Sequence, residues 1–117
     1  MNVLNTSDKN IEKTTISPAV LHKIALLTTL SVQGVSRMAS SKTSVNQIFN
    51  RQEDKGARVL VKDGKAFIDV YVVLMNNMNV RDISREIQSR VSRAISEMLG
   101  MEVGGVNIHI MDIDFTA

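Results

Sequence analysis

His109 is the first side chain to consider, because few others in this sequence could do chemistry. It lies close to Asp112 and Asp114, and an imidazole beside carboxylates could begin an acid–base or metal site. A metal site needs several convergent donors, however, and the chain has no second histidine near this one and no cysteine at all. We therefore expect His109 to have a structural or surface role.

The other candidates for catalysis are weaker. His22 lies early in an expected helix, and no serine or acidic residue is spaced around it as in a catalytic triad. Gly34, Gly56 and Gly64 are isolated, so none of them belongs to a loop that binds phosphate. Gly104-Gly105 precedes a strand rather than a helix. The sequence thus indicates neither an enzyme nor a bound cofactor or metal.

Two aromatic side chains form the most suggestive pair. Phe67 and Tyr71 lie four residues apart, which is two periods of strand alternation, and would point to the same side of a sheet. Such rings could stack on bases, as in sheet-type RNA binders, or belong to an apolar patch that a second subunit covers. A loop or tail of the same chain could also fold over them. The candidate partner-binding residues are Leu60, Phe67, Tyr71, Val73, His109 and Met111.

A basic helix face is the alternative binding surface. Asn79 suits the N-cap of this second expected helix, and Gly100 suits its left-handed end. Arg81, Arg85 and Arg93 point away from its apolar side and could contact nucleic acid or anionic lipid. The helix has four arginines against three acidic residues, so its net charge is only +1. A solvated face is the simpler interpretation.

Lys62-Asp63-Gly64-Lys65 predicts a hairpin, because Asp-Gly suits the positive φ angles of a type I′ turn. A two-residue loop sets Lys62 opposite Lys65, and Arg58 opposite Asp69. Alternation then sorts the side chains onto two faces. The core side carries Val59, Val61, Ala66, Ile68, Val70, Val72 and Leu74. The other side carries Arg58, Leu60, Phe67, Asp69, Tyr71 and Val73.

A first helix should precede the hairpin. Ser17 and Pro18 suit its N-cap and first position, and we expect it to run to about Val32 and to be terminated by Gly34. Its apolar residues cover more than one narrow stripe, so it should pack against the sheet and a second surface.

Three shorter segments complete the expected structure. Gly104-Gly105 should form the return to a last strand, with Val106, Ile108 and Ile110 inward and Asn107, His109 and Met111 outward. Thr14-Thr15-Ile16 could add a short edge strand before the first helix. Val45, Ile48 and Phe49, at helical spacing in a polar stretch, could form a short docking helix.

Composition bounds the architecture. The chain has 117 residues, 44% of them hydrophobic and 22% charged, which suits one soluble domain. We expect residues 1–13 to be a flexible segment and residues 14–117 to be a single domain. The net charge of +2 permits a polyanionic partner without demanding one. We find no export signal and no apolar run of about 18 residues, so we expect neither common export nor a membrane span.

These elements predict an α+β fold. Its sheet should be small, mixed or antiparallel, with three strands and the option of a fourth short edge strand. Two helices should pack on one face, in the order (β)-α-β-β-α-β.

Several ordered motifs also resemble one protein family. They are Gly34-Val35-Ser36-Arg37-Met38, Asp63-Gly64-Lys65, Ile68-Asp69-Val70-Tyr71-Val72-Val73, Ile87-Gln88-Ser89-Arg90-Val91 and Val106-Asn107-Ile108-His109-Ile110. Together they resemble the alkaline shock protein family of Gram-positive bacteria, also called the envelope stress response family, over about residues 14–115. The chain differs at Asn76-Asn77-Met78, where that family usually has an aromatic or polar residue followed by glycine.

The resemblance implies a non-enzymatic, cytoplasmic protein that forms homo-oligomers. It also implies recruitment to the inner face of the cell membrane by a separate, membrane-anchored homologue, in the service of envelope homeostasis under stress. His109 matches a recurrent family position. A nucleic-acid-binding module that uses the basic helix face or the outward rings is the less favoured alternative.

Overall fold

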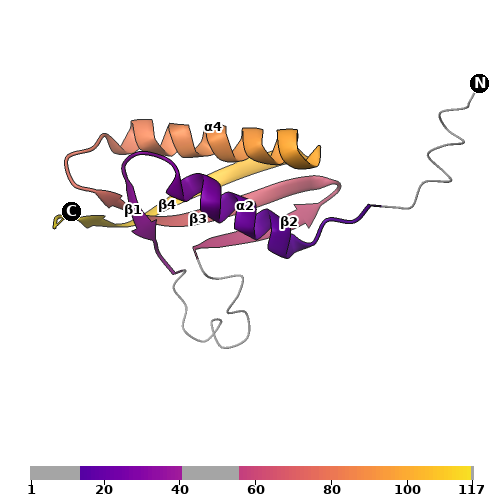
Figure 1. Ribbon diagram of the computed structural model, residues 1–117, viewed down its shortest axis with the longest axis horizontal. Coiled ribbons are helices and arrows are strands. Elements are labelled where there is room, and N and C mark those ends of the chain that lie inside the picture. Colours follow the sequence, from indigo (N-terminus) through magenta and orange to yellow (C-terminus); the bar gives the residue numbers. More distant parts are fainter. Residues whose placement is uncertain (1–13, 41–55, 117) are drawn as a thin grey trace, which may run out of the picture.

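The computed structural model describes residues 14–40 and 56–116 of the chain (Figure 1). Two helices lie on one side of a four-stranded sheet. In chain order the elements are α2 (Pro18–Leu30), β1 (Val35–Met38), β2 (Ala57–Lys62), β3 (Lys65–Met75), α4 (Val80–Leu99) and β4 (Glu102–Asp114). The α+β class with both helices on the same face, predicted from the sequence, is confirmed.

The strand β3 lies at the centre of the sheet. β4 runs parallel to it along one edge, from Lys65 to Met75. β1 and β2 are both antiparallel to β3. They meet at Tyr71, whose N–H donates to Gly56 O at 2.9 Å and whose carbonyl accepts from Ala39 N at 2.8 Å. Because N–H and C=O of one strand residue point to the same side, β1 and β2 lie end to end along the other edge of a mixed sheet.

The predicted hairpin register is confirmed at every pair. Lys62 lies opposite Lys65, and Arg58 lies opposite Asp69. Asp63 and Gly64 have φ angles of +53° and +77°. Positive φ at both central residues is the mark of a type I′ turn, which matches the twist of the strands that it joins. The turn therefore fixes which side chains reach the core, since a slip of one residue would exchange the faces.

The helix α2 begins as expected and ends early. Ser17 Oγ accepts the N–H of Ala19 at 3.1 Å, and Pro18 occupies the first turn. The last helical residue is Leu30 rather than Val32. Val32 instead lies in the turn that leads into β1, where its side chain is buried in the core.

The helix α4 is capped at both ends as predicted. Asn79 Oδ1 accepts the N–H of Asp82 at 3.0 Å, and Gly100 adopts a left-handed φ of +68°. A further hydrogen bond connects α4 to the sheet, since Gln88 Nε2 donates to Val106 O at 3.0 Å. The helix is thus held over β4 by polar as well as apolar contacts.

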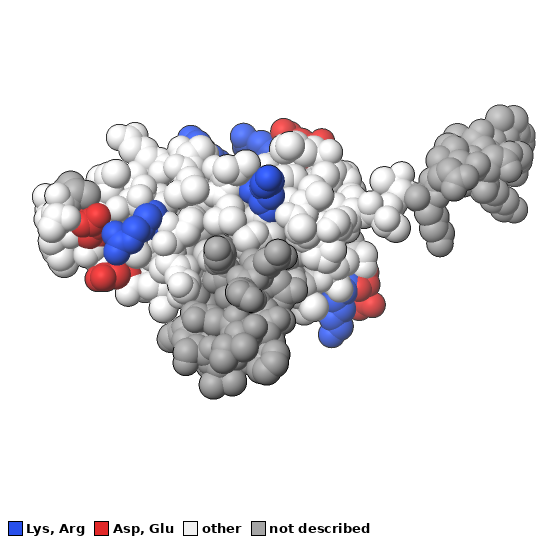
Figure 2. Space-filling model, turned by 60° about the horizontal axis from the view of Figure 1, so that its bottom comes forward, with Lys and Arg blue, Asp and Glu red and all other residues white. Residues whose placement is uncertain are grey.

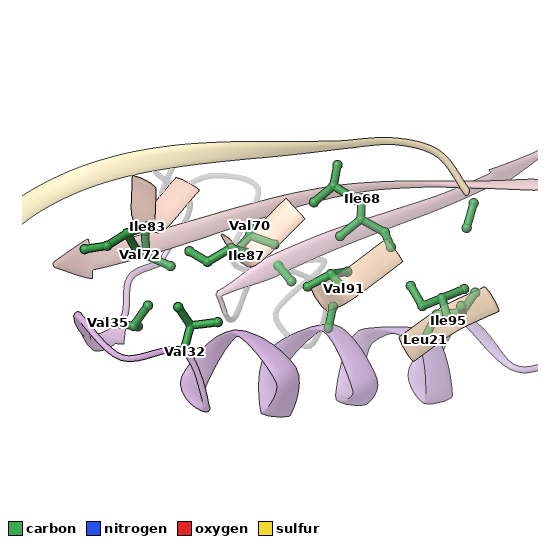
Figure 3. Close-up of a cluster of buried hydrophobic side chains, with 14 of the residues drawn as sticks. Leu21, Val32, Val35, Ile68, Val70, Val72, Ile83, Ile87, Val91 and Ile95 are labelled. Carbon is green, nitrogen blue, oxygen red and sulfur yellow. The ribbon is translucent and has the colours of Figure 1, made fainter. Parts of the chain in front are cut away.

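The hydrophobic core fills the space between the helices and the inner face of the sheet (Figure 3). Its fully buried larger side chains come from three elements and are Leu21, Ile68, Val70, Val72, Leu74, Ile87, Val91 and Ile95. Each such side chain contributes about 1.5–3 kcal/mol when removed from water. The core is aliphatic, as the composition predicts.

Two predictions about strands were wrong. Thr14-Thr15-Ile16 forms no strand, and the fourth strand is β1, after the first helix, where Val35 pairs with Leu74. The last strand begins at Glu102, so Gly104-Gly105 lies inside it rather than in a return. The physical reason is the ring of Phe67, which a Cβ at position 104 would overlap. The glycine makes room for a ring and not for a turn.

The turn before α4 lacks the usual glycine of the family. Asn77 adopts a φ of +64° there, a region that asparagine enters more readily than most residues with a side chain. Two other expectations, the flexible segment 1–13 and the docking helix around Val45, Ile48 and Phe49, lie outside the described residues.

Candidate functional site

The candidate site is the surface of the sheet that faces away from the helices, which we call the outer sheet face. Strand alternation builds it, because most of the intervening side chains enter or pack against the core. Val61, which was predicted on the core side, lies next to the hairpin turn and is 43% exposed. β2 and β3 contribute Arg58, Leu60, Phe67, Asp69, Tyr71 and Val73, while β4 contributes Asn107 and His109. The exposed Met111 follows in β4 at a register shift, after which Asp112 lies opposite Val73.

A polar cluster lies at the centre of the outer sheet face, and we call it the Asp69 cluster. Asp69 Oδ1 lies 2.9 Å from His109 Nε2 and accepts a hydrogen bond from Asn107 Nδ2 at 3.2 Å. The imidazole of His109 stacks on the ring of Tyr71, with centroids 4.6 Å apart and planes 14° from parallel. The parallel register of β3 and β4 sets these pairs side by side. The cluster therefore fixes the orientation of both rings.

The Asp69 cluster can orient and hydrogen-bond, but it lacks the parts of a reaction centre. An aspartate and a histidine supply the base of a triad, yet no hydrogen bond joins this imidazole to a hydroxyl nucleophile in residues 14–40 or 56–116. Within the same residues, no three His, Cys, Asp or Glu side chains are grouped so that they could hold a metal ion. His109 lies with Asp69 rather than with the acidic residues that follow it in sequence.

Apolar side chains flank the Asp69 cluster. Leu60 is 59% exposed and Met111 is 42% exposed. Phe67 is half-buried, because its ring lies across Gly104. Val73 is only 3% exposed, so this member of the predicted partner-binding set adds almost no accessible surface. The structure thus brings the predicted residues onto one face but exposes them unequally.

The end of the sheet carries a second polar group around Asp114. Its carboxylate accepts hydrogen bonds from the hydroxyls of Thr116 at 2.7 Å and Ser36 at 2.9 Å, and Arg37 Nη1 lies 3.5 Å away. These hydrogen bonds, with a smaller contribution from Arg37, hold the pKa of Asp114 below its ordinary value. The group ties the end of β4 to β1 across the end of β3.

The arginines of the alternative hypothesis lie on the other side of the molecule. Arg81, Arg85 and Arg93 are exposed on α4, which covers the inner face of the sheet. Their neighbour Arg90 forms an ion pair with Glu86 at 2.6 Å. On the face drawn in Figure 2, basic and acidic side chains mostly lie near one another and form no large patch of one sign. The arginines and the aromatic rings cannot therefore form one nucleic-acid surface.

Two members of the Asp69 cluster were missed from the candidate site. The sequence places Asp69 on the outward face without indicating a role. For Asn107 it predicts only that the side chain points outward. A carboxylate in the middle of the apolar run from Ile68 to Val73 was the available signal, because an internal strand tolerates such a residue only where it is exposed or paired. The identity of its partners depends on the β3–β4 register, which the sequence does not specify.

The fold and the site together define a small α+β domain with a polar and apolar sheet surface. None of the helices in the described residues is long and apolar enough to cross a membrane. A family comparison matches residues 6–115 to the alkaline shock protein 23 family, which is described as having a cell envelope-related function. The chain belongs to this family, which confirms the resemblance that its motifs suggested.

Relatives of known sequence support the same assignment. The uncharacterized protein YqhY of Bacillus subtilis is 27% identical over 114 residues, which cover 96% of this chain and 84% of YqhY. The uncharacterized protein Spy1535 of Streptococcus pyogenes is 33% identical over 100 residues, covering 84% of this chain and 76% of Spy1535. Among solved structures, a manganese form of the MamM CTD aligns with a TM-score of 0.49 at 11% identity, over 80% of this chain and 95% of that one.

Proposed function

We propose that this protein is a non-enzymatic, cytoplasmic adaptor of the cell envelope. It self-associates, and it docks on a membrane-held partner protein through the outer sheet face. Family membership supports the envelope role. The proposal adds the mode of action, which is contact between proteins rather than turnover of a substrate.

The composition of the outer sheet face is the observation that carries this proposal. Leu60 and Met111 are exposed large apolar side chains on either side of an ordered polar centre. Protein interfaces commonly have apolar and aromatic side chains beside fixed hydrogen-bonding groups, because the first supply affinity and the second supply specificity. The stacked pair Tyr71–His109 presents such groups with little loss of side-chain entropy on binding.

The decisive variant is Leu60→Asp combined with Met111→Asp. Both side chains are exposed, so the fold should tolerate the change while the apolar flanks are lost. The control is Ser89→Asp combined with Ser96→Asp, which adds the same charge on the exposed side of α4. We expect the native chain and the control to sediment with membranes from crosslinked cells, and the outer-face variant to stay in the supernatant.

Analytical ultracentrifugation supplies the second measurement. The native chain should sediment above its monomer mass in a concentration-dependent way. In the variant Phe67→Asp with Tyr71→Asp, circular dichroism should show an intact fold while the assembly state changes. Equal membrane retention of the outer-face variant and the native chain would contradict the proposal, as would a native chain that remains monomeric at high concentration.

A further inference from the structure

The two helices differ sharply in what they expose. α4 has seven charged residues, namely Arg81, Asp82, Arg85, Glu86, Arg90, Arg93 and Glu97, and all of them are on its exposed side. α2 lies beside α4 on the same face of the sheet (Figure 1). Among the Lys, Arg, Asp and Glu residues, α2 contains only Lys23. A helix at a protein surface normally carries polar residues opposite its core face. α4 follows this rule and α2 does not.

The exposed side of α2 carries an apolar stripe. Its buried side consists of Leu21, Ala25 and Thr29. Leu27 is 61% exposed, Leu30 is 46% exposed and Val20 is 43% exposed. At 3.6 residues per turn these three side chains lie on the side opposite the buried one, with Lys23 between them. We call Val20, Leu27 and Leu30 the α2 stripe.

The ends of α2 indicate what covers the α2 stripe. The helix has no acidic residue in its first turn and no basic residue in its last turn. Its macrodipole, positive at the N-terminus and negative at the C-terminus, is therefore not compensated by side chains of its own ends. An antiparallel copy of the same helix can place its Lys23 against the C-terminal end, where the positive charge compensates the negative end of the macrodipole. An anionic lipid surface offers no positive charge to that end.

We propose that two copies of this chain pair through α2, antiparallel and around a two-fold axis at Leu27. In that register Leu27 meets its counterpart, and Leu30 meets the partially buried Ile24 of the other copy. Lys23 then lies against the C-terminal turn of the other helix, near Ser31, where a positive charge is favourable. This pairing rests on the self-association in the proposed function and gives one interface for it. The interface is a different surface from the outer sheet face.

The size of the helix limits the strength of this pairing. α2 has 13 residues and is therefore about 20 Å long. A contact confined to one such helix on each side falls below the roughly 1,200–2,000 Å² of stable interfaces. The dimer should thus be weak and should form in proportion to protein concentration.

Single-cysteine crosslinking tests the geometry directly, because the chain has no cysteine of its own. Under mild oxidation, Leu27→Cys should form a disulfide-linked dimer at least about tenfold faster than Val20→Cys, since a disulfide needs Cα atoms within about 7 Å. In the antiparallel register the two copies of position 20 lie about 21 Å apart, at about 1.5 Å per residue. Ser89→Cys on α4 is the exposed control for random collision.

Each outcome decides the proposal. Equal rates for Leu27→Cys and Ser89→Cys would refute pairing at α2, and equal rates for Leu27→Cys and Val20→Cys would refute the antiparallel register. Neither result would bear on the docking role of the outer sheet face, which the double variant Leu60→Asp with Met111→Asp tests separately. Conversely, normal membrane retention of that double variant would contradict docking but would not change the expected crosslink at position 27.

A lipid surface is the competing occupant, and flotation with vesicles of phosphatidylglycerol and phosphatidylcholine tests it. Pairing between copies predicts no flotation of the native chain, and it predicts that Leu27→Glu weakens dimerisation about tenfold or more by bringing two carboxylates together at the axis. Flotation of the native chain that Leu27→Glu abolishes would assign the α2 stripe to a bilayer and overturn the pairing.

Discussion

Gly104 offers a sharp test of how the outer sheet face is built. A Cβ at this position would overlap the far edge of the Phe67 ring, whereas one at Gly105 would lie 4.0 Å from that ring, an ordinary contact. Gly104 does not have a positive φ, so backbone conformation does not require glycine there. The expected effect of Gly104→Ala therefore comes from the ring alone.

The magnitude follows from two opposed terms. Replacing glycine by alanine inside a strand stabilises the fold by roughly 0.5–1 kcal/mol, because glycine loses more backbone freedom on folding. Overpacking against a ring costs roughly 1–3 kcal/mol. Gly104→Ala should thus lower the free energy of unfolding by about 1–2 kcal/mol. In a Phe67→Ala background the overlap is gone, and the same substitution should be neutral or stabilising.

Urea denaturation of the four proteins in this double-mutant cycle measures the coupling between the two sites. We expect a coupling energy of about 1.5–3 kcal/mol, in the upper range for residues in contact. Gly105→Ala is the matched control and should show no such coupling to Phe67. If Gly104→Ala lowered the free energy of unfolding by the same amount with and without the Phe67 ring, the explanation that Gly104 leaves space for this ring would be wrong.

Three further predictions concern other positions. Thr29→Val should raise the free energy of unfolding by about 1 kcal/mol in urea denaturation, because the buried Thr29 hydroxyl finds no hydrogen-bond partner among the described residues. Gly100→Ala should lower it by about 1–2 kcal/mol, because the left-handed φ of +68° strains any residue with a Cβ although the surrounding space is open. Asp114→Asn should be less stable than the native chain at neutral pH, and this difference should shrink as the pH falls below about 3.8, the ordinary pKa of the group. The sign follows because a carboxylate whose pKa is lowered by folding stabilises the fold above its unfolded pKa and loses that contribution as it is protonated.

Local rules were sufficient for the hairpin and for α4. Asp63-Gly64 specifies a turn type, and the turn type specifies every pair between β2 and β3. Asn79 and Gly100 likewise mark the ends of α4, because each satisfies backbone groups that a helix leaves unpaired. In these elements the residues that determine the structure are neighbours in sequence.

Predictions failed where distant residues decide the structure. β1 has four residues and a register shift near Ser36, so its pattern does not alternate over enough positions to predict a strand. Gly104 suggested a turn because its actual partner, the ring of Phe67, lies on another strand. The pairing of His109 with Asp69 depends in the same way on a parallel register set by the α4 crossover.

The core separates two surfaces of different character, and this separation has a consequence for how the protein could act. The α2 stripe faces away from the sheet on the helix side, while the outer sheet face lies on the other side. Both can therefore be occupied at the same time. A two-fold pairing at α2 consumes one surface on each copy and leaves both outer sheet faces free. Under the proposed function, such a pair would present two docking sites to membrane-held partners. Linked sites bind far more firmly than either site alone, because the second contact forms at high effective concentration. If both proposals hold, a weak helix contact between copies would be sufficient to turn modest docking at each outer sheet face into stable retention at the envelope.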